Sequence, residues 1–492
     1  MAHRICARKA SLCVDQLESR YAPARLLGPT QLVYQDKDGD AVTVTFTKPV
    51  LNFGNPNTIF TFDSGVGAVN GSTAAREQLR RIDLTSIPVA SIGVGIKVNA
   101  IRSPINGGDG FAAVGEVNAT GIDLGAVRID GDLGRILAGD GMETTRGLAA
   151  LVTGSMGRNG TSTGAADLHS VIQGSLGSLM VRGDVKDANI TVQAGDIRAV
   201  AIDGSVIGGS ATAAGSITAE GDLRTCVIRG DLIGGSGVGT GLIGAGRTLG
   251  SVIVRGNVIG GSASGFTPLY ESGFIYGGTI RSVTIGGSLI AGTDNTSSQF
   301  LLNGSVLALN QLGRITINGS VIGNSTSQAV ISAGGQLAAT GTTDLAIGSV
   351  IVRGRVEHGL IIAGVDPVTT LDYQPVDADA QIGSVFVGGD WIASSIVAGA
   401  VAGTNGYFGD GDDTGMVGVA LYKDNPIAFS KIGSVTIGGQ VLGTIGGTDH
   451  YGFVAETIGS VHIGGTRVPT APGMHTDDVS IGTTGDFSIL EI

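Results

Sequence analysis

Six aspartates, gathered in two short turns, have the types and spacing that could bind a divalent cation. They are Asp36, Asp38 and Asp40 in the sequence DKDGD, and Asp410, Asp412 and Asp413 in the sequence GDGDD. Carboxylate oxygens are the ligands that calcium prefers, and glycine lets such a turn close tightly around the ion. An EF-hand is not predicted, because no glutamate stands at the twelfth position counted from Asp36. For the first turn the alternative is a plain hairpin turn built from aspartate and glycine.

The composition limits the class of protein that must position these turns. Glycine contributes 85 of 492 residues and 42% of the residues are hydrophobic, which excludes a solvated disordered polymer. With only 12 prolines, collagen is excluded as well. The formal net charge of −12 predicts no nucleic-acid partner. No stretch approaches the roughly 18 apolar residues of a membrane helix, so no membrane span is predicted.

A twelve-residue pattern, aliphatic-x-x-V-x-I-x-G-x-V-x-G, recurs along most of the chain. Its eleven copies begin at Leu124, Leu176, Ile197, Leu223, Leu249, Ile280, Leu312, Ile347, Ile382, Ile432 and Ile458. Positions four, six, eight and ten share one face of an extended chain; three of them are apolar, and the eighth is always glycine. We expect that glycine to let the backbone turn a corner. A shorter second element, such as SITAEGDL from Ser216, separates many copies. The sequence thus predicts an all-β fold: a parallel β-solenoid, specifically a right-handed β-helix.

The repeat predicts the environment of several individual residues. Cys226 stands at the fourth position and Trp391 at the tenth, so both are expected in the core. Cys6, Cys13 and Cys226 form neither a disulfide framework nor a metal-ligand spacing. At the seventh position, Arg182, Asp203 and Arg229 predict an outward row of alternating charges. More degenerate copies begin near Leu148 and Leu168.

The chain divides into four expected segments. Residues 1–26 are expected to be a disordered N-terminal export or sorting segment, and residues 27–105 a small β domain that caps the first repeat. In the latter, LVYQDKDGDAVTVTF predicts two alternating strands around a polar turn. Residues 106–468 hold the solenoid repeats. Residues 469–492 are a C-terminal cap, because Arg467 breaks the last repeat and GDFSILEI from Gly485 is suited to close that end.

Two long insertions, residues 366–380 and 404–431, interrupt neighbouring repeats. Because both follow a second-type element, we expect them to leave the same corner and stack side by side. Their acidic and aromatic residues are Asp366, Asp372, Asp377, Asp379, Asp410, Asp412 and Asp413, with Tyr373, Tyr407, Phe408 and Tyr422. This composition favours a surface that binds cations or carbohydrate, and solvated, mobile loops are the alternative.

An enzyme that cleaves acidic polysaccharides on a β-helix scaffold is the catalytic alternative. Similarity to polygalacturonase-type enzymes would require NTD, DD, GHG and RIK-like motifs in order, yet only the DD pairs Asp412-Asp413 and Asp477-Asp478 occur. The six histidines are scattered and are expected on the surface: His3, His169, His358, His450, His462 and His475. We therefore expect no catalytic residues and no obligatory cofactor, with calcium as the one possible ion.

Two resemblances to known groups of proteins imply where this protein is located. The segment from Leu17 to Ala24, LESRYAPA, resembles the LExRxxPA segment near the N-terminus of many planctomycete surface and secreted proteins, which implies export. The repeats from about residue 106 resemble the glycine-rich "beta strand repeat-containing" proteins of planctomycetes. Together they imply an exported, non-enzymatic protein with a structural or adhesive role at the cell surface or in the extracellular matrix. Its partner would be a surface or matrix polysaccharide or protein, and a calcium-dependent glycan-binding module is the other binding alternative.

Overall fold

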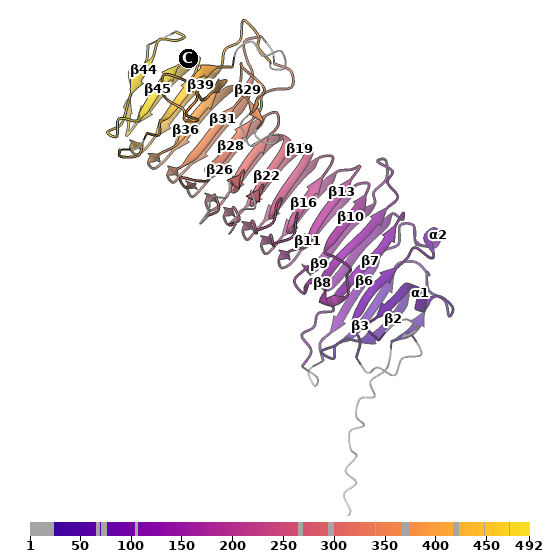
Figure 1. Ribbon diagram of the computed structural model, residues 1–492. Helices are drawn as coiled ribbons and strands as arrows, with labels where there is room; N and C mark the ends of the chain where they lie inside the picture. Colours follow the sequence, from indigo (N-terminus) through magenta and orange to yellow (C-terminus); the bar gives the residue numbers. More distant parts are fainter. Residues whose placement is uncertain are drawn as a thin grey trace, which may run out of the picture.

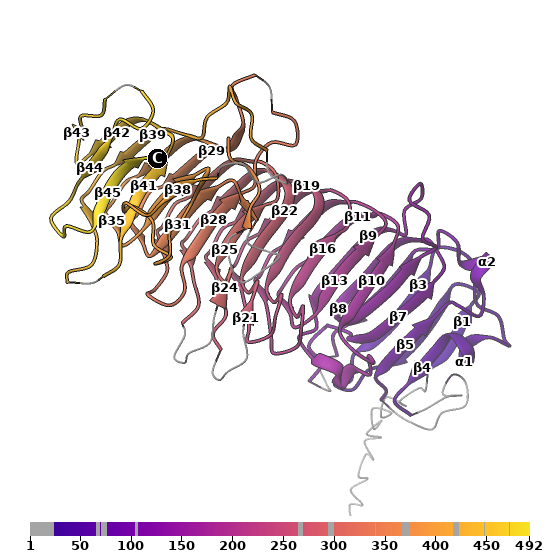
Figure 2. The same cartoon turned by 45° about the horizontal axis from the view of Figure 1, so that its top comes forward.

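The chain folds into an elongated stack of short strands that runs from residues near Arg25 at one end to Glu491 at the other (Figures 1 and 2). The computed structural model describes residues 24–64, 69, 76–103, 107–263, 269–293, 300–339, 341–366, 374–416, 423–446, 448–471 and 473–492. The prediction of an all-β protein is confirmed. Among these residues the helices are α1 (Pro56–Ile59), α2 (Pro88–Ser91) and the short 3-10 helix Gly160–Thr163. None of the described helices is long and apolar enough to cross a membrane.

The twelve-residue repeats form a first ladder of parallel strands, each hydrogen-bonded to the repeats before and after it. Its strands are β8 (Leu124–Gly139), β9 (Leu148–Met156), β11 (Leu176–Val181), β14 (Ile197–Ile202), β17 (Leu223–Ile228), β19 (Leu242–Val254), β22 (Phe274–Ile285), β26 (Leu312–Ile317), β29 (Leu345–Val352), β34 (Gln381–Val387), β39 (Lys431–Ile437) and β42 (Thr457–Ile463). The first residue of every copy pairs with the first residue of the next. Leu148 also pairs with Leu124 and Leu176, which confirms it as a degenerate copy.

A second ladder begins at the tenth repeat position. Its two-residue strands are β12 (Val185–Lys186), β15 (Val206–Ile207), β18 (Leu232–Ile233), β20 (Val258–Ile259), β23 (Leu289–Ile290), β27 (Val321–Ile322), β30 (Val356–Glu357), β35 (Trp391–Ile392) and β40 (Val441–Leu442). The pairing is again parallel and in register, so each copy from Leu176 to Ile432 contributes a second strand to the stack.

The second-type elements form the third ladder. They are β7 (Val114–Thr120), the end of β8, β10 (His169–Gln173), β13 (Asn189–Gln193), β16 (Ser216–Ala219), the beginnings of β19 and β22, β25 (Ser305–Ala308), β28 (Ala329–Ala333), β31 (Gly359–Ala363), β36 (Ser395–Ala398), β41 (Tyr451–Ala455) and β45 (Phe487–Glu491). The prediction that Leu168 opens a copy of the twelve-residue repeat is wrong, because β10, which follows it, pairs with β13 in this third ladder.

Antiparallel strands lie at both ends of the ladders. Near the N-terminus, β1 (Arg25–Gly28), β2 (Gln31–Gln35) and β3 (Ala41–Phe46) pair in sequence, and β3 pairs with β6 (Ile96–Ile101). Strand β6 then joins β8 in parallel, while β4 (Phe60–Phe62) pairs with β5 (Leu79–Asp83), which joins β7. Near the C-terminus, β43 (Thr466–Arg467) folds back on β42, and β44 (Asp478–Ser480) folds back on β45. Arg467 is exposed, as its departure from the repeat pattern predicts.

Inside the ladders, the apolar repeat positions form one continuous core. Cys226 and Trp391 are both fully buried in it, as predicted. Trp391 also donates a hydrogen bond from its indole Nε1 to the Ser394 carbonyl at 2.8 Å. Burial raises the pKa of the Cys226 thiol to about 12, so this thiol stays protonated and inert at neutral pH.

The eighth-position glycine is needed for a different reason from the one expected. Only Gly465 of the eleven has a left-handed φ, so a sharp bend does not explain the others. In the middle of the stack, a Cβ on Gly256 would lie 2.1 Å from Asp231 Oδ1 and 2.8 Å from the Gly230 carbonyl oxygen. The glycine is therefore required because successive repeats approach too closely there for any side chain.

The oxygen that crowds this glycine belongs to a row of polar side chains at the ninth repeat position. From Asp184 to Ser320, each accepts a hydrogen bond from the ninth backbone N–H of the following repeat. Examples are Ser205 N–H to Asp184 at 2.8 Å, Asp231 N–H to Ser205 at 3.1 Å and Asn257 N–H to Asp231 at 2.6 Å. These bonds satisfy backbone donors at a corner where the strand ladder is interrupted.

The seventh-position charges lie in the predicted row, but they pair only in part as expected. Arg229 contacts Asp203 of the preceding repeat at 3.1 Å. Arg182 instead reaches Asp130, two repeats away in the ladder, at 3.6 Å. The side chains are substantially exposed, so each pair contributes at most about 1 kcal/mol.

A second apolar cluster lies on the outer side of the third ladder, in the C-terminal half. It contains Phe274, Leu302, Leu307, Val330, Leu360, Ile362, Val365, Ala378, Val397, Ala400, Phe408, Met416 and Val454. Strands β28, β31 and β41 are accordingly buried at every position, whereas β13 alternates between buried and half-buried residues. The described parts of the two insertions therefore form a packed layer over this ladder.

Candidate functional site

The first acidic turn connects β2 to β3, as the sequence predicts. Gly39 closes it with a left-handed φ of +103°, and its N–H contacts Asp36 Oδ1 at 3.1 Å. Asp36 Oδ1 also accepts the N–H of Asp40 at 2.7 Å. Asp40 is fully buried, and its Oδ1 accepts the Ser103 N–H at 2.7 Å.

The remaining oxygens of this turn are also bound by the segment that leads into the first repeat. Asp40 Oδ2 accepts the Gly110 N–H at 2.5 Å, and Asp38 Oδ2 accepts the Asp109 N–H at 3.0 Å. Burial, and then a hydrogen bond with Asp38, raise the pKa of the Asp36 carboxyl to about 8, so this pair holds a proton at neutral pH. These hydrogen bonds attach the hairpin to residues 103–110, which agrees with the alternative of a plain hairpin turn.

The second acidic turn lies in the insertion between β37 (Ala400–Val401) and β38 (Thr414–Gly415), two strands that pair outside the main ladders. One carboxyl oxygen from each of Asp410, Asp412 and Asp413 lies within 4.8 Å of the others. The same is true of Asp36, Asp38 and Asp40, so both predicted sets are brought together. His450 Nε2 lies 4.0 Å from Asp410 Oδ2.

The three carboxyls of this second turn differ in their electrostatics. Burial, and then the negative charges of Asp410 and Asp412, raise the pKa of Asp413 to about 6, against an opposing hydrogen bond from the Gly409 N–H. Burial would raise the pKa of Asp410 too, but hydrogen bonds with Asp412 and Asn405 outweigh it and lower that pKa. The turn therefore concentrates negative charge around one buried carboxyl.

The two insertions meet, as predicted. The Ala378 N–H donates to the Lys423 carbonyl at 2.9 Å, and Lys423 Nζ lies 2.9 Å from Asp377 Oδ2 and 3.5 Å from Asp344 Oδ2. Asp344 and Asp377 are almost completely buried. Burial and the charge of Asp344 raise the pKa of Asp377 to about 7, although Lys423 opposes the shift. These carboxyls join the insertions to each other and are closed to a large substrate.

Two of the four predicted aromatic residues of the insertions lie in the described part of the chain, and their environments differ. Phe408 is buried in the outer apolar cluster, whereas Tyr407 is 40% exposed. The other two predicted aromatics, Tyr373 and Tyr422, lie outside the residues that the structure describes, as does Asp372. The same holds for residues 1–23, which carry nearly all of the predicted export segment, Cys6 and Cys13.

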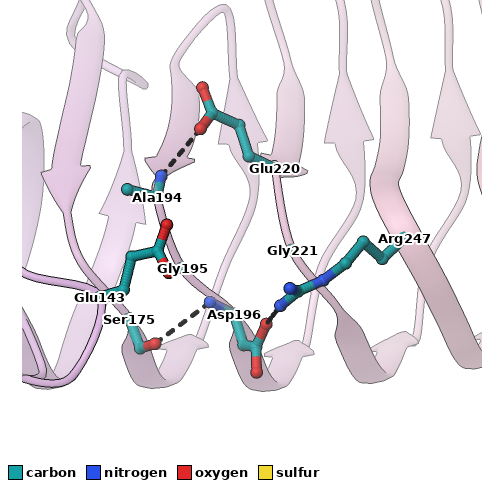
Figure 3. Close-up of a pocket in the computed structure, with 8 residues that line it drawn as sticks. All are labelled: Glu143, Ser175, Ala194, Gly195, Asp196, Glu220, Gly221 and Arg247. Atoms are coloured by element: carbon teal, nitrogen blue, oxygen red, sulfur yellow. Dashed lines mark hydrogen bonds and ion pairs between the residues drawn. The ribbon is translucent and has the colours of Figure 1, made fainter.

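Sequence reasoning missed a cleft of ≈ 280 Å³ on the outside of the stack (Figure 3). Its lining is Glu143, Ser175, Ala194, Gly195, Asp196, Glu220, Gly221 and Arg247. Arg247 Nη2 donates to Asp196 Oδ1 at 2.8 Å, and Asp196 accepts the Asp222 N–H at 2.9 Å. The Ala194 N–H donates to Glu220 at 2.8 Å. The polar groups of the lining thus bond one another across successive repeats. The signal in the sequence is the polar residue, Ser175 or Asp196, that stands just before the repeats beginning at Leu176 and Ile197.

The residues considered for catalysis are dispersed. Asp477 is buried, and both of its carboxyl oxygens accept the Ala471 N–H, at 2.9 and 3.0 Å. Among the histidines that the structure describes, His169 contacts Thr191, and His450 lies beside the predicted acidic residue Asp410. That approach is invisible in the sequence, because the two residues come from different repeats.

Comparisons with protein-family models, with curated proteins and with solved structures found no match to this chain.

Proposed function

We propose that the three ladders are the sides of a parallel β-solenoid, a right-handed β-helix in which residues 106–468 supply the coils. The pairing pattern supports this, because strands 21 to 50 residues apart pair in parallel at equivalent repeat positions. Residues 27–105 and 469–492 would cap the two ends, which carry the antiparallel strands. Twelve repeats at about 4.8 Å each give a rod of roughly 60 Å, so small-angle X-ray scattering should give an elongated profile.

We infer that this rod has a structural or adhesive role, without enzymatic activity, at the cell surface or in the extracellular matrix. The observation that carries the proposal is that the first positions of successive repeats still pair across both long insertions, Ile347 with Ile382 and Ile382 with Ile432. Such a stack is stiff, and it holds the insertions at fixed places on one side through the outer apolar cluster. The mechanism would be presentation of these insertions to a polysaccharide or protein partner.

Localisation in the cells that produce the protein tests this proposal. Fractionation should place the chain in the envelope or the medium, and protease added to intact cells should degrade the cell-bound protein while a cytosolic marker survives. Sequencing of the mature N-terminus should show whether the segment resembling LExRxxPA is retained. A protein that stays with the cytosolic marker and resists the protease would refute the surface role.

Activity and binding assays separate the alternatives. Incubation with acidic polysaccharides should release no reducing ends and no unsaturated sugars; release of either would establish the enzyme instead. A glycan array probed with calcium and with a chelator would identify a calcium-dependent glycan-binding module if binding occurred only with calcium.

A further inference from the structure

The turn that contains Asp410, Asp412 and Asp413 has one buried oxygen for which its own fold provides no donor. Asp413 is only 8% exposed, and its Oδ2 accepts the Gly409 N–H at 2.6 Å. Its Oδ1 is inaccessible to water and has no hydrogen-bond partner within the described part of the chain. A carboxylate oxygen buried without a partner is costly, and a bound cation would remove that cost.

The surroundings of this oxygen are negative. The carboxyls of Asp410 and Asp412 each place an oxygen within 4.8 Å of an Asp413 oxygen. In the described structure, the one basic group within ion-pair distance of these three carboxyls is His450, at 4.0 Å from Asp410. Among the described residues, no arginine or lysine therefore neutralises the mutual repulsion of the three carboxyls.

The rest of the turn is organised around the carboxyls. Asp412 Oδ2 accepts the Thr404 N–H at 3.0 Å, and Asp410 Oδ2 accepts Asn405 Nδ2 at 2.5 Å. A Cβ on Gly403 would lie 2.0 Å from the Asp412 carboxyl carbon, so the chain closes tightly on this side chain. These bonds hold two of the three carboxyls in place before any ligand arrives.

The first acidic turn shows why this arrangement is significant. Its spacing of aspartates is similar, but backbone N–H groups of Ser103, Asp109 and Gly110 occupy its carboxyl oxygens. None of the carboxyl oxygens of Asp36, Asp38 or Asp40 is both buried and unpartnered. Of the two turns, only the second therefore combines an acidic cluster with a buried carboxylate oxygen that has no hydrogen-bond donor among the described residues.

We propose that Asp410, Asp412 and Asp413 bind calcium. The donor set consists of carboxylate oxygens without a thiolate, which suits calcium better than zinc. Oxygens on opposite sides of a calcium ion are about 4.6–5.2 Å apart, because each lies about 2.3–2.6 Å from it. The observed separations fit within that limit, and water would complete the coordination.

The ion would also fasten the insertion to the stack. Gly409, which donates to Asp413, has a φ of +103°, and a Cβ there would lie 2.3 Å from the Tyr451 carbonyl oxygen. The turn thus lies directly against β41 of the third ladder. Because Phe408 and Met416 anchor the same insertion in the outer cluster, calcium would reduce the opening of the whole described segment around residues 403–416.

Calorimetric titration of the full chain with calcium chloride, after treatment with a chelator, tests the proposal. We expect one site with a dissociation constant of about 0.1–1 mM, as in extracellular calcium modules. Asp413→Asn should weaken binding at least tenfold. Asp412→Asn should do the same, and because asparagine keeps a side-chain oxygen for the Thr404 N–H and Asp412 is exposed, the turn should stay folded. Asp38→Asn is the matched control in the other turn and should bind as the wild type does.

Hydrogen exchange gives a second measurement. Calcium should slow exchange of peptides covering residues 403–416 in the wild type and in Asp38→Asn, but not in Asp412→Asn. No heat of binding, equal affinity in Asp412→Asn, or loss of binding in Asp38→Asn would each overturn the assignment. These results do not depend on where the protein resides, so the surface role and the calcium site can fail separately.

Discussion

Replacement of Gly256 by alanine is the sharpest test of how the repeats stack. The new Cβ would lie 2.1 Å from Asp231 Oδ1 and 2.8 Å from the Gly230 oxygen, where ordinary contacts are 3.4–4 Å. The Asp231 side chain must therefore rotate away, and it then loses its hydrogen bond from the Asn257 N–H. The backbone of the preceding repeat cannot move without breaking ladder hydrogen bonds on both sides.

Two costs add in this variant. Overpacking against backbone costs about 1–3 kcal/mol, and loss of a hydrogen bond to a charged acceptor costs about 1.5–3 kcal/mol. Alanine restricts the unfolded chain more than glycine does, and this offsets about 0.4–1 kcal/mol of the loss. We therefore expect Gly256→Ala to lower the free energy of unfolding by about 1.5–5.5 kcal/mol.

A double-mutant cycle with Asp231→Ala separates these costs. In that background the displaced carboxylate is already absent, so Gly256→Ala should cost about 1.5–3 kcal/mol less than in the wild type. Urea denaturation followed by circular dichroism gives the free energies, and hydrogen exchange of peptides around residue 256 reports the local effect. Gly28→Ala is the control, because a Cβ there meets nothing within 4 Å. Additive effects in the cycle, or equal effects of Gly256→Ala and Gly28→Ala, would refute the explanation.

Two further substitutions test the core and the contact between the insertions. Trp391→Ala removes a fully buried ring and its bond to the Ser394 carbonyl, and should lower the free energy of unfolding by about 3–5 kcal/mol; a change below 1 kcal/mol in urea denaturation would contradict this packing. Asp377 has its pKa raised from 3.8 to about 7, so the folded chain holds a proton that the unfolded chain releases, and stability should fall as pH rises from about 4 to 7. Asp377→Asn cannot titrate and should make that slope shallower in melting temperatures measured from pH 5 to 8, because Asp36 and Asp413 still contribute; an unchanged slope would refute a contribution of Asp377.

The repeat ladder could be predicted from the sequence because its cause is periodic. An apolar side chain at every second position and an invariant glycine fix which residue of one repeat lies beside which residue of the next. Leu249 thus pairs with Ile280 although the chain between them is longer than in the preceding repeat. The reason for the glycine was misjudged, because its conflict with Asp231 arises only between repeats.

The outer layer could not be predicted in the same way. Phe408 and Met416 lie in an insertion that occurs once, so no periodic pattern marks them as buried. Their partners, such as Val454, belong to strands whose other face is already buried in the main core. A strand buried on both faces has a continuous apolar sequence, and YGFVA in β41 was the available signal.

The calcium site lies in an insertion for a reason that follows from the stack itself. Within the repeats, polar side chains such as Asp184 and Asp231 are committed to backbone N–H groups of the next repeat. A substitution there breaks a bond that the ladder needs, so these carboxylates have little freedom to take up an ion. An insertion has no neighbouring copy whose backbone N–H groups need acceptors. Asp413 Oδ1 accordingly remains without a donor among the described residues. Any ligand-binding function of this chain should therefore be sought where the periodicity is interrupted. Within the repeats, the polar side chains at the ninth position should tolerate few substitutions.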